Sequence, residues 1–117
     1  RLQTIYASLQ EIIEANKPEI MVVEKLFFAK NVTTAMSVSH ARGVIMLSGV
    51  QAGVKIVEYT PLQIKQALTG YGRAEKHQIQ EMVRVSLRLK TIPKPDDCAD
   101  ALAAALTHAT VPQIAHL

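Results

Sequence analysis

The sequence predicts an α/β fold built around a parallel pair of strands. The short apolar run 20–23, rich in β-branched residues, is typical of a buried strand, and residues 54–59 have the pattern of a second strand. A segment of helical composition, residues 32–52, separates them. Two strands joined by one long helix pair in parallel, with the helix as the crossover connection. Further helical segments follow the second run, so helices and strands belong to one α/β unit.

The first half of the chain is predicted to contain two helices. Apolar residues at helical spacing predict an amphipathic helix over residues 1–16, which Pro18 ends. The helix expected over residues 32–52 contains Gly43 and Gly49. A glycine in a helix interior costs about 1 kcal/mol relative to alanine. We therefore expect another backbone to pack closely at both glycines.

The second half of the chain carries clear helix boundaries. Thr60-Pro61-Leu62-Gln63 has the pattern of a capping box with proline at the first helical position. Gly70-Tyr71-Gly72 interrupts the helical pattern, and another helix is expected over residues 74–89, with Ile79, Met82, Val83 and Leu87 on one face. A last helix begins near Asp96. A sheet of two strands is too small to be stable alone, so we expect further strands before Arg1.

Composition limits the class of protein. A chain of 117 residues corresponds to one domain at most, so residues 1–117 are predicted to form a single domain, and 49% hydrophobic residues suffice for a core. No apolar run approaches the length of a membrane span, and no secretory signal is visible. The single cysteine, Cys98, excludes an internal disulfide and a multi-cysteine zinc site, which favours a cytoplasmic setting. The start at Arg1, without methionine, suggests a fragment or a processed chain.

Positive charge is concentrated in residues 61–90. The whole chain has a net charge of +3, whereas this segment alone has a net charge of +4. Its basic residues are Lys65, Arg73, Lys76, Arg84, Arg88 and Lys90. Such asymmetry points weakly to a polyanionic partner, and an ordinary solvated helix face remains the alternative.

Three acids form the candidate metal site. Glu24 ends the first strand, where open α/β sheets place their ligands, and the i, i+3 spacing of Asp97 and Asp100 puts both on one face of the last helix. Each acid also has an ordinary explanation, as a strand end or as a first-turn acid that complements the helix dipole. Carboxylates that converge in a partly buried cleft are unfavourable unless a cation lies between them. The set therefore indicates Mg²⁺ or Mn²⁺, ions that can assist phosphodiester hydrolysis.

Five segments, in this order, carry a family resemblance. They resemble the RuvC-type crossover junction endodeoxyribonucleases, and the likeness extends over essentially the whole chain. The segments are Val22-Val23-Glu24-Lys25-Leu26-Phe27-Phe28-Ala29-Lys30-Asn31, Ala41-Arg42-Gly43-Val44, Gln63-Ile64-Lys65-Gln66-Ala67, Gly70-Tyr71-Gly72-Arg73-Ala74-Glu75-Lys76, and Asp96-Asp97-Cys98-Ala99-Asp100-Ala101-Leu102-Ala103 with Thr107-His108.

The resemblance implies an RNase-H-like fold and a DNA endonuclease that resolves Holliday junctions by symmetric, Mg²⁺-dependent nicks in recombination and repair. It implies that Glu24, Asp97 and Asp100 are catalytic acids that hold the metal. Lys65 and Lys76 would support cleavage at the phosphate. The DNA-binding residues would be Phe27, Lys30, Arg42, Lys65, Arg73 and Lys76. The implied partners are four-way junction DNA, a second copy of the chain in a homodimer, and a branch-migration complex of RuvA and RuvB type proteins.

One departure from the family pattern affects the expected activity. The family's first strand carries a Gly-Ile-Asp-Pro-Gly motif whose aspartate belongs to the metal site, and no such motif occurs here. We therefore expect this chain alone to be truncated at its N-terminal strands and weak or inactive as a nuclease. Two other readings stay open: a non-catalytic DNA-junction-binding module, and a structural α/β fragment whose partner supplies strands. His40, His77, His108 and His116 show no metal-ligand spacing and are expected in surface or core roles.

Overall fold

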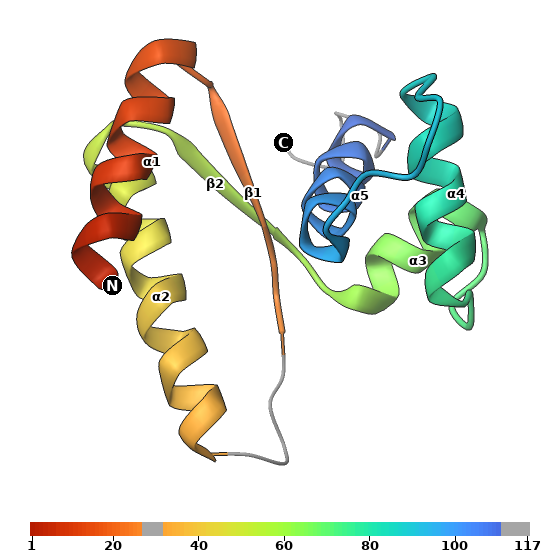
Figure 1. The fold of residues 1–117 in the computed structure, drawn as a ribbon, viewed down its shortest axis with the longest axis horizontal. Helices are drawn as coiled ribbons and strands as arrows, with labels where there is room; N and C mark the ends of the chain where they lie inside the picture. Colours follow the sequence, from red (N-terminus) through yellow and green to blue (C-terminus); the bar gives the residue numbers. More distant parts are fainter. Residues whose placement is uncertain (27–31, 111–117) are drawn as a thin grey trace. The chain divides into compact units, whose positions relative to one another are not determined.

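The structure of the protein, a computed structural model, describes residues 1–26 and 32–110. The elements follow the expected order of helix, strand, helix, strand and three helices (Figure 1). They are α1 (Leu2–Asn16), β1 (Ile20–Glu24), α2 (Val32–Gln51), β2 (Lys55–Tyr59), α3 (Pro61–Thr69), α4 (Lys76–Ser86) and α5 (Asp96–Thr110). Across the described residues, no helix combines the length and the apolar composition that crossing a bilayer requires.

The two strands form the parallel pair that the sequence predicts. β1 and β2 are neighbours in a two-stranded sheet. The backbone N–H of Lys55 donates to the carbonyl of Glu19 at 3.1 Å, and that of Lys25 donates to the carbonyl of Tyr59 at 2.7 Å. Residue numbers rise together along both strands between these bonds, so the pair is parallel. β1 is half-buried rather than buried as expected, because among the described residues it has a neighbouring strand on one side only.

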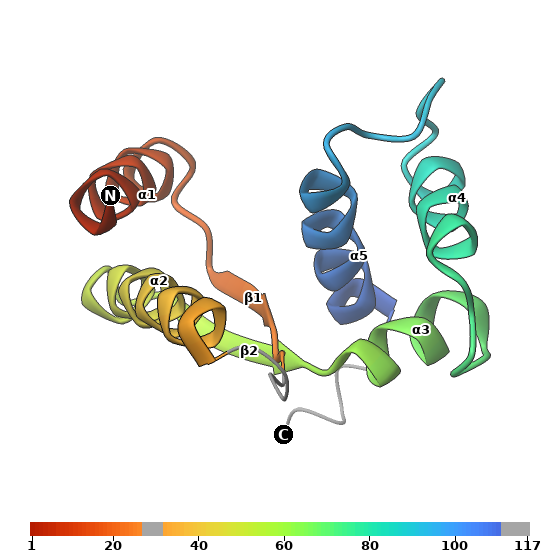
Figure 2. The ribbon, with the colours of Figure 1, turned by 60° about the horizontal axis from the view of Figure 1, so that its bottom comes forward.

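The described residues of Arg1–Met21 and Phe27–Val57 form one compact unit. Within it α1 packs against α2, and the two helices lie side by side in both views (Figures 1 and 2). Buried Ile13, Ser48 and Val54 form the centre of this unit. α1 ends as predicted, since Lys17 adopts the left-handed conformation at φ 47° and its N–H donates to the carbonyl of Ile13.

The two glycines of α2 differ in their surroundings. A Cβ at Gly49 would lie 3.1 Å from Cε and 3.2 Å from Sδ of Met21, whereas a Cβ at Gly43 would meet no atom of the described residues within 4 Å. Close packing is found at Gly49, where the side chain of Met21 makes the contact instead of the expected backbone. The same expectation is wrong at Gly43, which lies on an exposed part of the helix.

The described residues of Val22–Leu26 and Glu58–Leu117 form the second unit, in which α3, α4 and α5 pack on one another (Figure 2). Small side chains on α5 allow its close approach, since Ala99, Ala103 and Ala104 are almost completely buried. Val83 of α4 and Thr107 of α5 are fully buried, and the Thr107 hydroxyl donates to the carbonyl of Ala103 at 2.9 Å. This three-helix core holds the ends of the strands and the candidate site.

The predicted boundaries of α3 are confirmed, and those of α4 differ. Thr60 accepts a hydrogen bond from the Gln63 N–H while the Gln63 side chain accepts from the Thr60 N–H, and Gly70 ends α3 at φ 74°. α4 is shorter than the expected helix over residues 74–89 because Glu75 caps its start and its last turn ends at Ser86. Of its expected apolar face, Ile79 and Val83 are buried and Met82 is half-buried, whereas Leu87, beyond the helix, is 39% exposed.

The surroundings of the two glycines predict that a methyl group is tolerated better at Gly43 than at Gly49. We expect Gly43→Ala to stabilise the protein by about 1 kcal/mol, because the new methyl group meets open space and alanine favours the helix. Gly49→Ala should gain less, because Met21 must first move by a few tenths of an ångström. Urea unfolding of both variants measures the difference. A loss of stability in Gly43→Ala, or an equal gain in both, would contradict this description of the α2 surface.

Candidate active site

A pocket of about 260 Å³ in the second unit brings together charged residues from one strand and three helices. Its walls carry two acids, Glu24 and Asp100, and two lysines, Lys65 and Lys76. The other lining residues are Pro61, Ile64, Ala74, Ile79 and Ala103. Four charged groups therefore share one small space with largely apolar walls.

Local structure fixes where each acid lies. Glu24 is the last residue of β1, and the next N–H, that of Lys25, is bonded to the carbonyl of Tyr59 at the end of β2. Asp100 lies one turn into α5, between the buried Ala99 and Ala103. Its side chain is half-buried.

The two lysines come from the helices on either side of the Gly70–Gly72 turn. Lys65 lies in α3, whose first turn the Thr60 capping box fixes, and it is half-buried. Lys76 is the first residue of α4. The structure thus brings four of the five predicted catalytic residues into one pocket.

The electrostatics of Glu24 reflect this arrangement. Burial raises the pKa of Glu24 above its usual value of 4.5, the negative charge of Asp100 raises it further, and the positive charge of Lys65 opposes both. A carboxyl group that shares its pocket with a second carboxylate favours the binding of positive charge. This pair of oxygen-donor groups is of the type that hard divalent cations prefer.

Asp97 takes a different position from the other two acids. Its side chain is exposed in the first turn of α5, and it does not line the pocket. Across residues 1–26 and 32–110, no three His, Cys, Asp or Glu side chains form a group that could hold a metal ion. The structure therefore pairs Glu24 with Asp100, and the role of Asp97 as a metal ligand stays a prediction.

Lys76 has a partner that the sequence did not reveal. Its Nζ lies 3.0 Å from Oδ2 of Asp96, the first residue of α5, and Gln80 Nε2 donates to Oδ1 of the same carboxylate at 3.2 Å. The hydrogen bond between Lys76 and Asp96 raises the pKa of Lys76 and lowers the pKa of Asp96. Asp96 had suggested only a helix start, because twenty positions in the sequence separate it from Lys76 and no local pattern links them.

A second contact that the sequence did not reveal connects the end of β2 to α5. The hydroxyl of buried Tyr59 lies 2.6 Å from Nδ1 of His108. Burial also raises the pKa of Tyr59. His108 is half-buried, so it contributes to the packing that holds α5 beside the strand ends.

The remaining predicted DNA-binding residues lie outside the pocket lining or outside the described residues. Arg73 is exposed in the turn before α4, and Arg42 is half-buried in α2 of the first unit. Phe27 and Lys30 fall outside the described residues.

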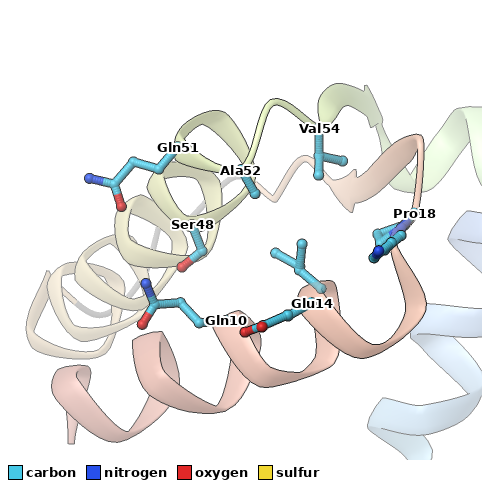
Figure 3. Close-up of a pocket in the computed structure, with 9 residues that line it drawn as sticks. Gln10, Glu14, Pro18, Ser48, Gln51, Ala52 and Val54 are labelled. Carbon is cyan, nitrogen blue, oxygen red and sulfur yellow. The ribbon is translucent and has the colours of Figure 1, made fainter.

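A larger cavity, of about 400 Å³, lies in the first unit. Gln10 and Glu14 extend into it from α1 and Ser48 from α2, with Pro18 and Val54 at one end (Figure 3). Its lining contains one acid and one lysine, so it has no pair of converging carboxylates. The charge arrangement therefore places the candidate active site in the smaller pocket.

The environment of Glu24 makes a prediction that does not depend on activity. In an NMR titration, the Glu24 carboxyl signal should have its midpoint above 4.5. The midpoint should fall in Asp100→Asn, which removes a repelling charge, and rise in Lys65→Met, which removes an attracting one. A midpoint at or below 4.5, or no response to Asp100→Asn, would contradict the proximity of the two acids.

The same shift sets the sign of a pH effect on stability. The native protein holds the Glu24 proton more tightly than the unfolded chain, so Glu24 lowers stability as pH rises from 4.5 through its native pKa. Glu24→Gln should therefore raise the melting temperature relative to the native sequence, and the increase should be larger at pH 7 than at pH 4.

The sequence matches known proteins over most of its length. The sequence model of the family described as crossover junction endodeoxyribonuclease RuvC matches residues 1–108. The relative of that name from Brevibacillus brevis is 61% identical over 109 residues, which are 93% of this chain and 66% of the relative. The one from Desulforamulus reducens is 56% identical over 93% of this chain and 67% of its own length. The chain thus spans about two thirds of the length of these curated relatives.

Solved structures give the same result. The Thermus thermophilus RuvC structure superposes with a TM-score of 0.89 at 39% identity, covering 97% of this chain and 69% of that one. The same protein in complex with a Holliday junction substrate gives a TM-score of 0.89 at 41% identity, over 93% and 66% of the two chains. These likenesses confirm the RNase-H-like fold expected from the sequence. The chain therefore belongs to the crossover junction endodeoxyribonuclease RuvC family.

Proposed function

We propose that the protein is a structure-selective DNA endonuclease that resolves Holliday junctions by Mg²⁺-dependent phosphodiester hydrolysis, giving symmetric nicks in recombination and repair. The observation that carries the proposal is the pairing of Glu24 with Asp100 in one pocket, beside Lys65 and Lys76. Family membership supports the reaction, and the likeness to a RuvC solved with a Holliday junction substrate supports the substrate. The chain spans about two thirds of the length of these relatives, so the activity of the whole protein is proposed for this chain.

Glu24 and Asp100 would hold the metal ion, with Asp97 as a third ligand from the first turn of the same helix. The raised pKa of Glu24 supports this role, because a pocket that favours an added proton also favours a cation. When bound, Mg²⁺, or Mn²⁺ in its place, supplies an activated water and stabilises the charge that develops on the phosphate.

The two lysines would bind the phosphate at which the chain is cut. Lys65 already attracts the charge of Glu24, since it lowers the pKa of that carboxyl group. Lys76 is more exposed, so its ammonium group is accessible to a DNA phosphate. Charged hydrogen bonds from lysines position the backbone of the substrate. The proposed role of each lysine is therefore to bind and orient the phosphate against the acid pair.

The proposal also includes further DNA-contacting residues and protein partners. Phe27 would contact bases, and Lys30, Arg42 and Arg73 would contact the DNA backbone. A homodimer would place two equivalent sites on the two strands of a symmetric junction, and exposed Met36 and Leu47 on α2 offer apolar surface for it. RuvA and RuvB type proteins would be further partners. Residues 1–117 would act as one nuclease domain in the cytoplasm, where Cys98 stays reduced.

Substitution of the acid pair separates this proposal from a non-catalytic junction-binding module. In the full-length protein, Glu24→Gln and Asp100→Asn should each lower the rate of junction cleavage by ~100-fold or more, because each removes a ligand of the metal. Binding of junction DNA, measured by gel shift, should remain. Glu19→Gln, which changes an exposed acid immediately before the start of the same strand, is the matched control and should cleave normally. Cleavage that survives both substitutions would leave the binding module as the better description.

The described part of the site also predicts the behaviour of the 117-residue chain by itself. Its pocket contains two acids rather than three, so a divalent ion should bind weakly. We expect cleavage of a four-way junction by this chain to be weak or undetectable at millimolar Mg²⁺. Efficient Mg²⁺-dependent cleavage by the purified 117-residue chain would overturn this expectation.

A further inference from the structure

We propose that Asp96 is a positioning residue for Lys76, holding its ammonium group beside the acid pair in readiness for a DNA phosphate. The inference deepens the proposed function and rests on it, because it assigns to that site a residue that neither the metal-ligand set nor the phosphate-binding set includes.

The geometry engages both oxygens of the Asp96 carboxylate. Oδ2 lies 3.0 Å from Nζ of Lys76, and Oδ1 accepts a hydrogen bond of 3.2 Å from Nε2 of Gln80. Lys76 and Gln80 are four residues apart on α4, so both point from the same face of that helix. The carboxylate is thereby fixed in orientation, and through it the end of the Lys76 side chain is fixed as well.

The ion pair leaves Lys76 able to bind substrate. A lysine ammonium group has three N–H donors, and one bond to Asp96 leaves two for phosphate oxygens. A lysine side chain that is free in solution loses its rotational freedom when it binds. Asp96 restricts the Lys76 side chain before DNA arrives. Part of the cost in rotational freedom is therefore not incurred when Lys76 engages the phosphate.

Asp96 also determines which acid Lys76 pairs with. The negative charges of Asp100 and Asp97 act on Lys76 as well, although less than Asp96 does. Without Asp96, the ammonium group would be drawn toward Asp100, where it would compete with the metal ion. Asp96 therefore keeps Asp100 available as a ligand while it keeps Lys76 near the pocket.

The exposure of the pair argues against a role in stability alone. The side chains of Lys76 and Asp96 are 59% and 51% exposed, and ion pairs as exposed as this one contribute little to folding. Asp96→Asn keeps the shape of the side chain and its place in the first turn of α5. The variant should therefore fold normally, so that its effect on the reaction can be measured separately.

The test is a double-mutant cycle on the full-length protein with a four-way junction as substrate. We expect Asp96→Asn to lower kcat about three- to tenfold with little change in KM, as expected for loss of one ordered side chain. In a Lys76→Met background the same substitution should have no further effect. Glu81→Gln, which removes an exposed acid paired with Arg84 on the same helix, is the matched control and should leave kcat unchanged. An unchanged kcat in Asp96→Asn, or an equal loss in both backgrounds, would overturn the proposal.

A second measurement does not depend on cleavage. In ¹⁵N-lysine NMR spectra, the Lys76 ammonium signal should be visible and slowly exchanging in the native sequence and in Glu81→Gln, and broadened in Asp96→Asn. If the full-length protein without substitutions cuts no junction, the proposed function fails, and this signal still decides whether Asp96 orders Lys76. A Lys76 signal that Asp96→Asn leaves unchanged would overturn the positioning role.

Discussion

Two carboxylates that share a partly buried pocket repel each other, and both lose hydration that bulk water would supply. Glu24 and Asp100 are in this situation. Burial and the charge of Asp100 both disfavour the ionised form of Glu24, so its pKa is raised. The other side chains that line the pocket are apolar or basic. Positive charge near the two acids offsets their repulsion, and Lys65, a bound proton or a metal ion can each supply it.

The strand ends and helices of the second unit position the charged residues of this pocket. The parallel pairing of β1 and β2 ends with the bond from Lys25 to Tyr59, which sets where Glu24 leaves the strand. Alanines on α5 let that helix approach closely enough for Asp100 to enter the pocket. Lys65 on α3 offsets part of the repulsion at Glu24, and Lys76 on α4 is paired with Asp96 and also attracted by the charge of Asp100. The pocket thus carries acids and lysines on its walls.

Features encoded in short segments could be predicted from the sequence, and features that depend on how helices meet could not. The Thr60 capping box and the position of Glu24 at a strand end follow from neighbouring residues, so both were predicted correctly. The i, i+3 spacing of Asp97 and Asp100 suggested a shared role, but the approach of α5 to the pocket leaves Asp100 half-buried and Asp97 exposed. The contact between Lys76 and Asp96 depends on the crossing of α4 and α5, which no local pattern encodes. Family resemblance identified the residues of the site, while the geometry identified which of them lie together.

The central claim is that Glu24 and Asp100 form a divalent cation site, and Mn²⁺ binding followed by NMR tests it most directly. Paramagnetic Mn²⁺ broadens signals close to the ion, so substoichiometric Mn²⁺ should first broaden the amide signals of Glu24, Lys25 and Asp100. Signals around Glu14, in the cavity of the first unit, should stay sharp. Excess Mg²⁺ should reverse the broadening. Broadening that begins elsewhere, or that Glu24→Gln and Asp100→Asn leave unchanged, would contradict the claim.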